Sequence, residues 1–434
     1  MKKIITSAGL VVLGAASLQS VNAQDLASPN AAKPWSVSLA LRGFYDSNYD
    51  TQPGANAKSS FGMEVTPSAS YNFNNGGPTT AGVSAVYTLK YYADRVDNDA
   101  DHSYQVNAHV DHNFNENYSA KVSDSFVVAQ EAELVNEPGT AEATFLRANG
   151  NNIRNTVHSD FMAQLTPVIG LQFSYNNNFY DYANDNGVGS YAALLNRLEH
   201  LATLDLRYKV LPQTTALVGY QFGYVDYTSD EPLAVATSAK GVVSNLDPSS
   251  RDVYEHYIYG GVDHTFTTAL TGSLRVGAEY ADYFNDDSTS GAWNPYVDAS
   301  LSWRYLPGST ITVGVHHALN QTDVAGTGLS TGAALSQANL VLNQESTLGY
   351  INLVHKITGD LTGTLMAQIQ NSSYNGGSFD GFTDNYYMLG ASLSYMIKPW
   401  IMAETGYTLD RLDSDIPGRE FTRNRVYLGL RTVY

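Results

Sequence analysis

Apolar and polar residues alternate along most of this chain, and this period of two is the feature that most restricts its fold. One clear example is residues 297–305, in which one parity is apolar and the other is polar: Val297, Ala299, Leu301, Trp303 and Tyr305 against Asp298, Ser300, Ser302 and Arg304. Successive side chains of a β-strand point to opposite faces, so the pattern indicates strands with one apolar and one polar face.

About eighteen segments alternate in this way, and each is long enough for the roughly 9–11 residues that a tilted membrane strand needs. We expect strands at residues 35–45, 60–72, 80–95, 103–114, 118–130, 153–166, 170–183, 195–210, 214–228, 252–266, 270–284, 294–306, 309–320, 345–358, 361–374, 384–398, 401–411 and 420–434. An even number lets the last strand pair with the first, and closure leaves no unpaired backbone edge in lipid. The predicted fold is an all-β, closed, antiparallel, up-and-down transmembrane β-barrel.

The connections between these strands alternate in length. Tight turns are expected at residues 115–117, 167–169, 211–213, 307–308, 359–360 and 399–400. Long polar segments lie between them, at 131–152, 229–251 and 321–344. Short periplasmic turns and long extracellular loops are typical of bacterial outer-membrane barrels, so the first strand is expected to run outward from the periplasm.

The first residues have the features of a secretory signal. Lys2 and Lys3 precede a short apolar run at residues 4–18, and the small residue Ala23 predicts cleavage before Gln24. The alternative is a retained anchor, but a lipoprotein anchor would need a cysteine and the chain has none. We therefore expect a signal peptide at 1–23 and a single barrel domain at 24–434. The residues before the first strand are too few for a plug domain.

Composition excludes several functional classes. There are 24 Lys and Arg against 42 Asp and Glu, and loss of Lys2 and Lys3 would move the formal net charge from −18 to −20. Nucleic acid is therefore an improbable partner, because its phosphates need a basic surface. The absence of cysteine excludes disulfides and thiol chemistry. The 31 tyrosines suit a membrane–water boundary, where an apolar ring carries a polar tip.

The C-terminus alternates up to a terminal aromatic residue, through Val426, Leu428, Leu430, Thr432 and Tyr434. This pattern resembles the signal by which outer-membrane barrels are recognised by their assembly machinery. We expect that machinery to be a partner, together with outer-membrane lipid and lipopolysaccharide. The expected location is the outer membrane of a Gram-negative bacterium.

Two stretches resemble the putative beta-barrel porin family of large outer-membrane proteins. One is Tyr45-Asp-Ser-Asn-Tyr-Asp-Thr-Gln-Pro53, and the other is Asn196-Arg-Leu-Glu-His-Leu-Ala-Thr-Leu-Asp-Leu-Arg-Tyr-Lys-Val-Leu-Pro212. The resemblance implies an open barrel, which in some members lies beside polysaccharide-export systems. It supplies no catalytic or substrate-binding residues.

Several motifs could suggest chemistry. His316 and His317 are adjacent, so on a strand they point to opposite faces and cannot share a metal. Five further histidines have the lipid-facing parity and are interpreted as interfacial residues: His112, His200, His256, His264 and His355. Residues 97–101 have alternating acids like the start of a calcium loop, but His102 and Ala108 replace the expected Gly and Glu. We expect a solvated acidic loop, with weak divalent-cation binding as the alternative.

A catalytic constellation is also weighed. Glu199, Asp205, Glu255 and Asp263 share the luminal parity, as paired carboxylates would need to. Carboxylates are also what a water-filled pore shows, so we expect no enzyme, metal or cofactor. Asp124 and Asn177 fall on the lipid-facing parity, and a β-bulge that shifts the register is expected near each.

The function expected from these features is passive diffusion of small hydrophilic solutes through a porin-like channel. At this strand number side chains do not fill the bore. The residues expected to line it are Glu64, Lys90, Asp111, Lys121, Asp205, Arg207, Arg275, Glu279, Asp298, Arg304, Glu404, Arg425 and Arg431. The alternatives are a surface barrel that binds host or envelope polymers, and a barrel associated with polysaccharide export. An inward-folded long loop would help to separate these hypotheses, and the oligomeric state is open.

Overall fold

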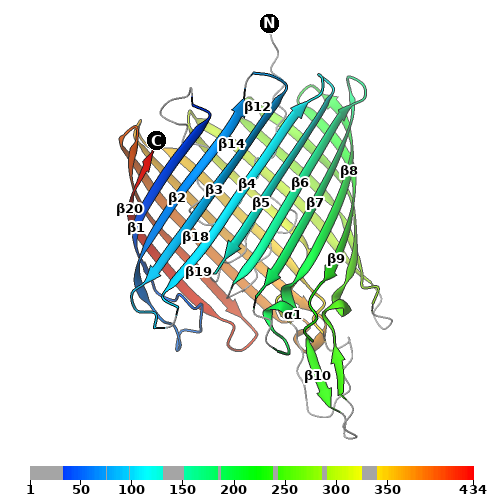
Figure 1. Cartoon of the computed structure of the whole chain (residues 1–434). Helices are drawn as coiled ribbons and strands as arrows, with labels where there is room; N and C mark the ends of the chain where they lie inside the picture. The colour runs from blue at the N-terminus through cyan, green and yellow to red at the C-terminus, as the bar shows by residue number, and fades with distance from the viewer. Residues whose placement is uncertain are drawn as a thin grey trace.

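The computed structural model describes residues 33–434 except for 75, 97, 131–150, 184–186, 238–242, 286–290 and 325–339. The described residues form one large antiparallel sheet that closes into a barrel (Figure 1). Its eighteen strands are β1 (Trp35–Asp46), β2 (Ser60–Asn74), β3 (Thr79–Tyr92), β4 (Ala100–Asn113), β5 (Tyr118–Ala129), β6 (Asn152–Gln164), β7 (Ile169–Tyr182), β8 (Arg197–Leu211), β9 (Thr214–Tyr227), β12 (Val253–Thr267), β13 (Leu270–Asp282), β14 (Ala292–Leu306), β15 (Ser309–Asn320), β16 (Asn343–Lys356), β17 (Leu361–Asn375), β18 (Thr383–Lys398), β19 (Ile401–Ser414) and β20 (Phe421–Val433).

Closure occurs between the first and last strands. β1 pairs with β20 from Ser38 opposite Val433 to Asp46 opposite Arg425. Beyond the ladder, Tyr434 and Val37 exchange two backbone hydrogen bonds of 2.9 and 3.0 Å. The predicted strand number, antiparallel pairing and closure are confirmed, and the sheet has no free edge to leave unpaired in lipid.

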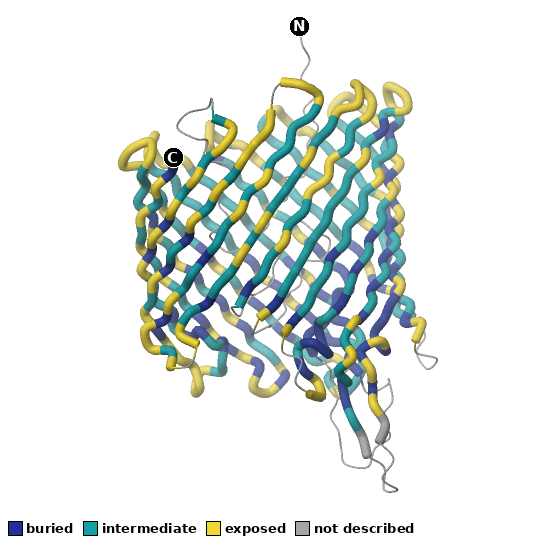
Figure 2. Tube along the Cα trace, viewed as in Figure 1, coloured by how far each residue is buried: buried dark blue, intermediate teal, exposed yellow. Residues whose placement is uncertain are grey.

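The two faces of the sheet differ as the alternation predicts. On the outer face the apolar side chains are exposed in the isolated chain, as Leu41 and Leu428 show at 48% and 68%. The polar side chains of the same strands face inward, where Arg42 is buried. Figure 2 shows exposed residues alternating with less exposed ones along the strands. Lipid is the environment that an exposed apolar belt of this kind requires.

The two ends of the barrel carry connections of different length. At the short-turn end, which also holds both described termini, the turns are two to four residues long, such as 399–400. At the long-loop end the connections contain further elements: α1 (Tyr191–Leu195), β10 (Ala234–Thr237), β11 (Val243–Leu246) and the 3-10 helices η1 (Pro248–Arg251) and η3 (Gly377–Phe379). The period of two does not extend into these loops and did not predict these elements.

The predicted bulges near Asp124 and Asn177 are wrong. Both residues lie in unbroken register, and the register shifts of the sheet are confined to the short-turn end. The two side chains face outward and are satisfied by polar neighbours. Asn155 donates to Asp124 at 2.7 Å, and Asn177 lies 3.2 Å from His200 Nδ1. Local hydrogen bonding on the outer face therefore replaces the register change that we expected.

Within the described residues no helix has the length and apolar character to cross a membrane.

Candidate functional site: the inner face of the barrel

All of the residues predicted to line the bore lie on the inward parity of their strands. They are Glu64 on β2, Lys90 on β3, Asp111 on β4, Lys121 on β5, Asp205 and Arg207 on β8, Arg275 and Glu279 on β13, Asp298 and Arg304 on β14, Glu404 on β19, and Arg425 and Arg431 on β20. The barrel brings several of them together across neighbouring strands. Their contact with a water-filled pore stays a prediction.

A cluster of charges crosses the closing seam. The Arg42 guanidinium donates to Glu64 at 2.8 Å and to Glu404 at 2.7 Å. Arg431 also pairs with Glu404, at 2.6 Å. Arg42 was missing from the predicted set, although it shares the parity of the neighbouring polar residues on β1. The cluster joins four strands, β1, β2, β19 and β20, and fixes their charged side chains in place.

A second cluster lies on the inner face of β8, β12 and β13. Asp263 accepts hydrogen bonds from Arg207 at 2.5 Å and from Arg275 at 2.7 Å. Nearby, Tyr259 donates to Asp205 at 2.8 Å. Two of the carboxylates weighed as catalytic therefore serve as acceptors within a fixed hydrogen-bond network.

The other two weighed carboxylates also have fixed partners, and one of them, Glu255, contacts a loop residue. Glu199 pairs with Arg197 at 2.6 Å. Glu255 accepts from the Gln321 amide at 2.9 Å, and Glu279 accepts from the backbone N–H of Leu319 at 2.8 Å. Among the described residues no group of three or more His, Asp or Glu is arranged to hold a metal ion.

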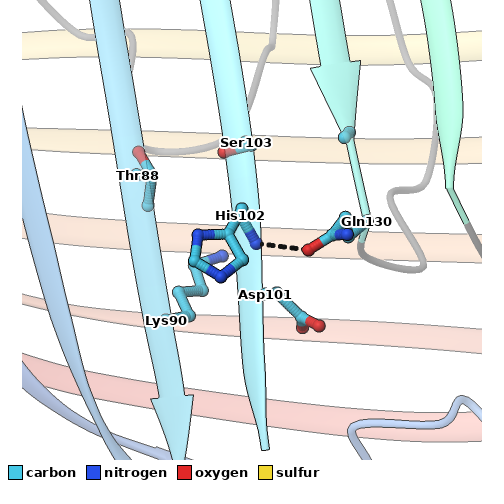
Figure 3. Close-up of a pocket in the computed structure, with 7 residues that line it drawn as sticks. Thr88, Lys90, Asp101, His102, Ser103 and Gln130 are labelled. Atoms are coloured by element: carbon cyan, nitrogen blue, oxygen red, sulfur yellow. Dashed lines mark hydrogen bonds between the residues drawn. The ribbon is translucent and has the colours of Figure 1, made fainter. Parts of the chain in front are cut away.

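Lys90 lies at a small polar recess on the inner side of β3 and β4, near the long-loop end. The recess is lined by Thr88, Lys90, Asp101, His102, Ser103, Ala129 and Gln130 (Figure 3). Gln130 accepts the backbone N–H of His102 at 2.8 Å, and Arg95 donates to both oxygens of Asp101. Asp97, where the weighed calcium loop begins, lies outside the described residues.

A short segment of the loop between β15 and β16 packs across the long-loop end. We call residues 321–324 the crossbar. Tyr227 on β9 donates to Gln321 at 2.9 Å, and the buried Arg251 donates to the carbonyl of Thr322 at 2.6 Å. Arg419, from the loop between β19 and β20, holds Asp323 through two hydrogen bonds of 2.8 and 2.9 Å. The crossbar is thus attached to parts of the wall that are several strands apart.

Apolar packing fixes the other stem of the same loop. Leu340 packs with Leu195 of α1 and with Leu233 and Leu246 from the loop between β9 and β12. Val341 packs with Val324, Tyr374 and Ile416 on the opposite side. The loop at 321–344 is therefore folded inward in its described parts, one of the arrangements that the sequence left open. Residues 131–150, in another of the long segments, lie outside the described residues.

The histidines follow strand parity. His316 is buried on the inner face 3.4 Å from Asp298, whereas His317 lies on the outer face. Each lipid-facing histidine approaches a hydroxyl on another strand, at 2.7–2.8 Å, in the pairs His112 with Thr79, His200 with Tyr175, His256 with Tyr220, His264 with Thr214 and His355 with Tyr305. These pairs satisfy polar rings at the membrane boundary.

Burial, hydrogen bonds and neighbouring charges shift the pKa values of charged groups in the long loops. Burial raises the pKa of Asp252 to about 6, and nearby Asp226 adds to the rise, against hydrogen bonds from Tyr227 and Asn285 that lower it. The opposite holds for exposed Asp415, whose pKa is lowered by hydrogen bonds from Thr383. Arg419 has a raised pKa: its carboxylate partners, Asp323 first, outweigh its burial. Arg419, which holds the crossbar, therefore stays charged at any physiological pH.

Comparison with known proteins identifies the family. The family described as "Putative beta-barrel porin 2" matches residues 36–434. The chain belongs to this family. As a member of this porin family with a closed barrel, it is a Gram-negative outer-membrane protein. No curated protein matches the chain.

Solved structures with a similar fold include porins and a receptor. A BenF-like porin from Pseudomonas fluorescens Pf-5 is 12% identical, covers 92% of this chain and 99% of its own, and has a TM-score of 0.45. OccK2 (OpdF) from Pseudomonas aeruginosa, in complex with glucuronate, is 11% identical, with coverage of 92% and 96% and a TM-score of 0.44. A mutant ferric enterobactin receptor (PfeA) from the same species is 7% identical, with coverage of 93% and 81% and a TM-score of 0.46.

Proposed function

We propose that the chain forms a water-filled channel for passive diffusion of small hydrophilic solutes across the outer membrane. The observation that supports this most is the inner face of the closed barrel, where acidic and basic side chains lie on strand after strand. An apolar or collapsed interior would not accommodate charges such as Arg207, Asp263 and Arg275 in one layer. A barrel of this strand number is too wide for its side chains to fill.

The crossbar makes the long-loop end the narrower part of the proposed channel. Its contacts with Glu255, Arg251 and Arg419 place peptide backbone inside the ring of strands. Solutes would pass beside it, so its position limits their size. Short turns of bacterial barrels face the periplasm, so the crossbar lies at the extracellular entrance.

Single-channel recording of the purified protein in planar bilayers tests the proposal. The wild type is expected to give discrete conductance steps in KCl. Arg419→Ala removes both hydrogen bonds to Asp323 and the one to Asp384, so the crossbar should loosen and the conductance should rise or fluctuate. Arg411→Ala is the control, because Arg411 is exposed and pairs with Asp413 away from the crossbar.

Absence of conductance steps in both wild type and Arg419→Ala would contradict the channel. Steps seen only after Arg419→Ala would instead favour the surface barrel, with a pore closed by its loops. The mass of the purified protein tests the related proposal that the signal is cleaved before Gln24.

A further inference from the structure

Four exposed cations lie at the short-turn end of the barrel. We call them the rim cations: Lys209 on β8, Arg304 on β14, Lys356 on β16 and Lys398 on β18. Each strand runs toward the short-turn end, and each cation is within two residues of the last residue of its strand. All four are exposed; Lys209, Arg304 and Lys356 have the inward parity, and Lys398 follows a register shift at the turn itself.

The rim cations differ from the paired arginines of the inner face because they lack ion-pair partners. Within the part of the chain that the structure describes, no carboxylate lies within 4.0 Å of their charged atoms, whereas Arg431 on β20 is paired with Glu404. The short turns contain two acids, Glu116 and Asp360, and Asp111 lies on the inner face two residues from the end of β4. None of these three acids forms an ion pair with a rim cation, so among the described residues the rim cations stay unpaired at this end of the bore.

We propose that the rim cations form an anion-collecting vestibule, which binds polyvalent anions that approach from the periplasmic side. This inference rests on the proposed channel function. Charges of one sign on a low-dielectric wall raise the local concentration of counter-ions. The field of each charge extends about 8 Å at physiological salt. The fields of several cations on one rim therefore add together only for ions that are inside the opening.

The opposite end has the opposite charge. The described residues of the long loops include eleven acids and four bases. When the extracellular side is positive, cations enter through the acidic end and anions through the basic end, so both carriers accumulate in the bore. The reverse voltage depletes both. The pore therefore conducts better when the long-loop side is positive, and this asymmetry fades at high salt.

The experiment adds inorganic tripolyphosphate to one side of a bilayer that holds the full-length mature channel. The wild type should be blocked from the short-turn side at a concentration about tenfold lower than from the long-loop side. Orientation is read from a cysteine at exposed Ala55 in the first long loop, biotinylated and capped with streptavidin, because the chain has no other cysteine.

Two variants with equal charge loss separate the rim from cations at the opposite end. Lys209→Gln with Arg304→Gln removes two rim cations and should abolish most of the sidedness. Lys58→Gln with Arg411→Gln removes two exposed cations near the long-loop end, and should preserve it. The first double variant with Lys356→Gln and Lys398→Gln added should remove the sidedness entirely and equalise the current at the two voltages.

Only variants that give wild-type conductance steps at 1 M KCl enter this comparison, so misfolding cannot imitate the result. If the fourfold variant does not insert, the two double variants decide. Equal block from both sides, or unchanged block in the first double variant, would overturn the vestibule while leaving the channel intact. Absence of any conductance would overturn the proposed function itself.

Discussion

At the long-loop end the luminal arginines are buried and paired, whereas at the short-turn end the rim cations are exposed and unpaired. Arg423 lies against Asp46, and Arg419 binds both Asp323 and Asp384. Lys356 and Lys398 have no such partners among the described residues. The paired charges fix loops and strands in place, whereas the unpaired rim cations are the groups that we propose to bind anions.

The backbone differs in the same way between the two ends. Short turns close with local hydrogen bonds, as where Leu361 accepts from the backbone N–H of Ile357 and donates its own N–H to the Thr358 hydroxyl. Long loops contain buried polar groups that need specific partners, such as the buried Arg251 with the carbonyls of Leu194 and Thr322. Mutations at the two ends should therefore fail in different ways.

The largest effect is expected at the short-turn end. Deleting Tyr434 removes the last residue of the predicted assembly signal and two backbone hydrogen bonds to Val37, so most of the protein should be lost from the outer membrane. Tyr434→Phe keeps the aromatic ring and should assemble normally. Surface labelling and the gel shift between unboiled and boiled samples measure both variants.

Refolding separates recognition from stability. If the truncated chain refolds in detergent to a barrel that shifts on boiling, its defect in cells lies in recognition by the assembly machinery. Wild-type surface levels of the truncated protein would show that Tyr434 is not part of an assembly signal.

The next largest effect concerns a buried pair. Arg42→Ala leaves Glu64 and Glu404 buried with one cation fewer, which should lower the free energy of unfolding by about 3–5 kcal/mol. Arg411→Ala breaks an exposed pair with Asp413 and should leave stability unchanged within error. Denaturant unfolding in detergent measures both. Equal effects would mean that burial does not distinguish the paired charges from the exposed ones.

The sequence was sufficient for the strands because lipid and water impose opposite demands on alternate residues. It therefore also placed the luminal residues on the right parity, from Glu64 to Arg431. It could not predict the Arg42–Glu404 pair, because 362 residues separate the two and only closure brings them together. The sequence could not predict the crossbar either, because its partners lie in loops and strands that are distant from it in the sequence.

The expected bulges were wrong because a local contact satisfies the polar side chain and makes a register change unnecessary. Asp124 faces outward without a bulge because Asn155 satisfies it, and a single-strand pattern does not contain the neighbouring strand. The sequence contains a local pattern around two of the rim cations. Lys209 and Arg304 each precede a Leu-Pro turn, in Lys-Val-Leu-Pro and Arg-Tyr-Leu-Pro, but only the barrel shows that they share one rim.

A smaller effect is expected on ion selectivity. The acids of the long loops, such as Asp230 and Glu231, should give a cation preference at low salt that fades as screening increases. The rim cations oppose it, so the fourfold glutamine variant should be more cation-selective than the wild type. The reversal potential in a KCl gradient, at low and high ionic strength, measures this. Anion preference of the wild type at low salt would mean that the rim, rather than the loops, sets selectivity.

The smallest effect is a pH dependence confined to the long-loop end. Because the pKa of Asp252 is raised to about 6, its contribution to stability is fully present below about pH 4 and is lost as the pH rises through 6. Asp252→Asn cannot ionise, so its stability relative to wild type should rise on the order of 1 kcal/mol from pH 4 to pH 7.

The matched variant is Asp415→Asn at the same end of the barrel. The pKa of Asp415 is lowered by hydrogen bonds from Thr383, so ionised Asp415 stabilises the fold at neutral pH and this contribution is lost as the pH falls through its lowered pKa. Relative to wild type, Asp415→Asn should therefore lose stability from pH 4 to pH 7, the opposite sign to Asp252→Asn. Denaturant unfolding at pH 4, 5 and 7 measures both differences. Equal signs would show that burial of Asp252 does not control its ionisation.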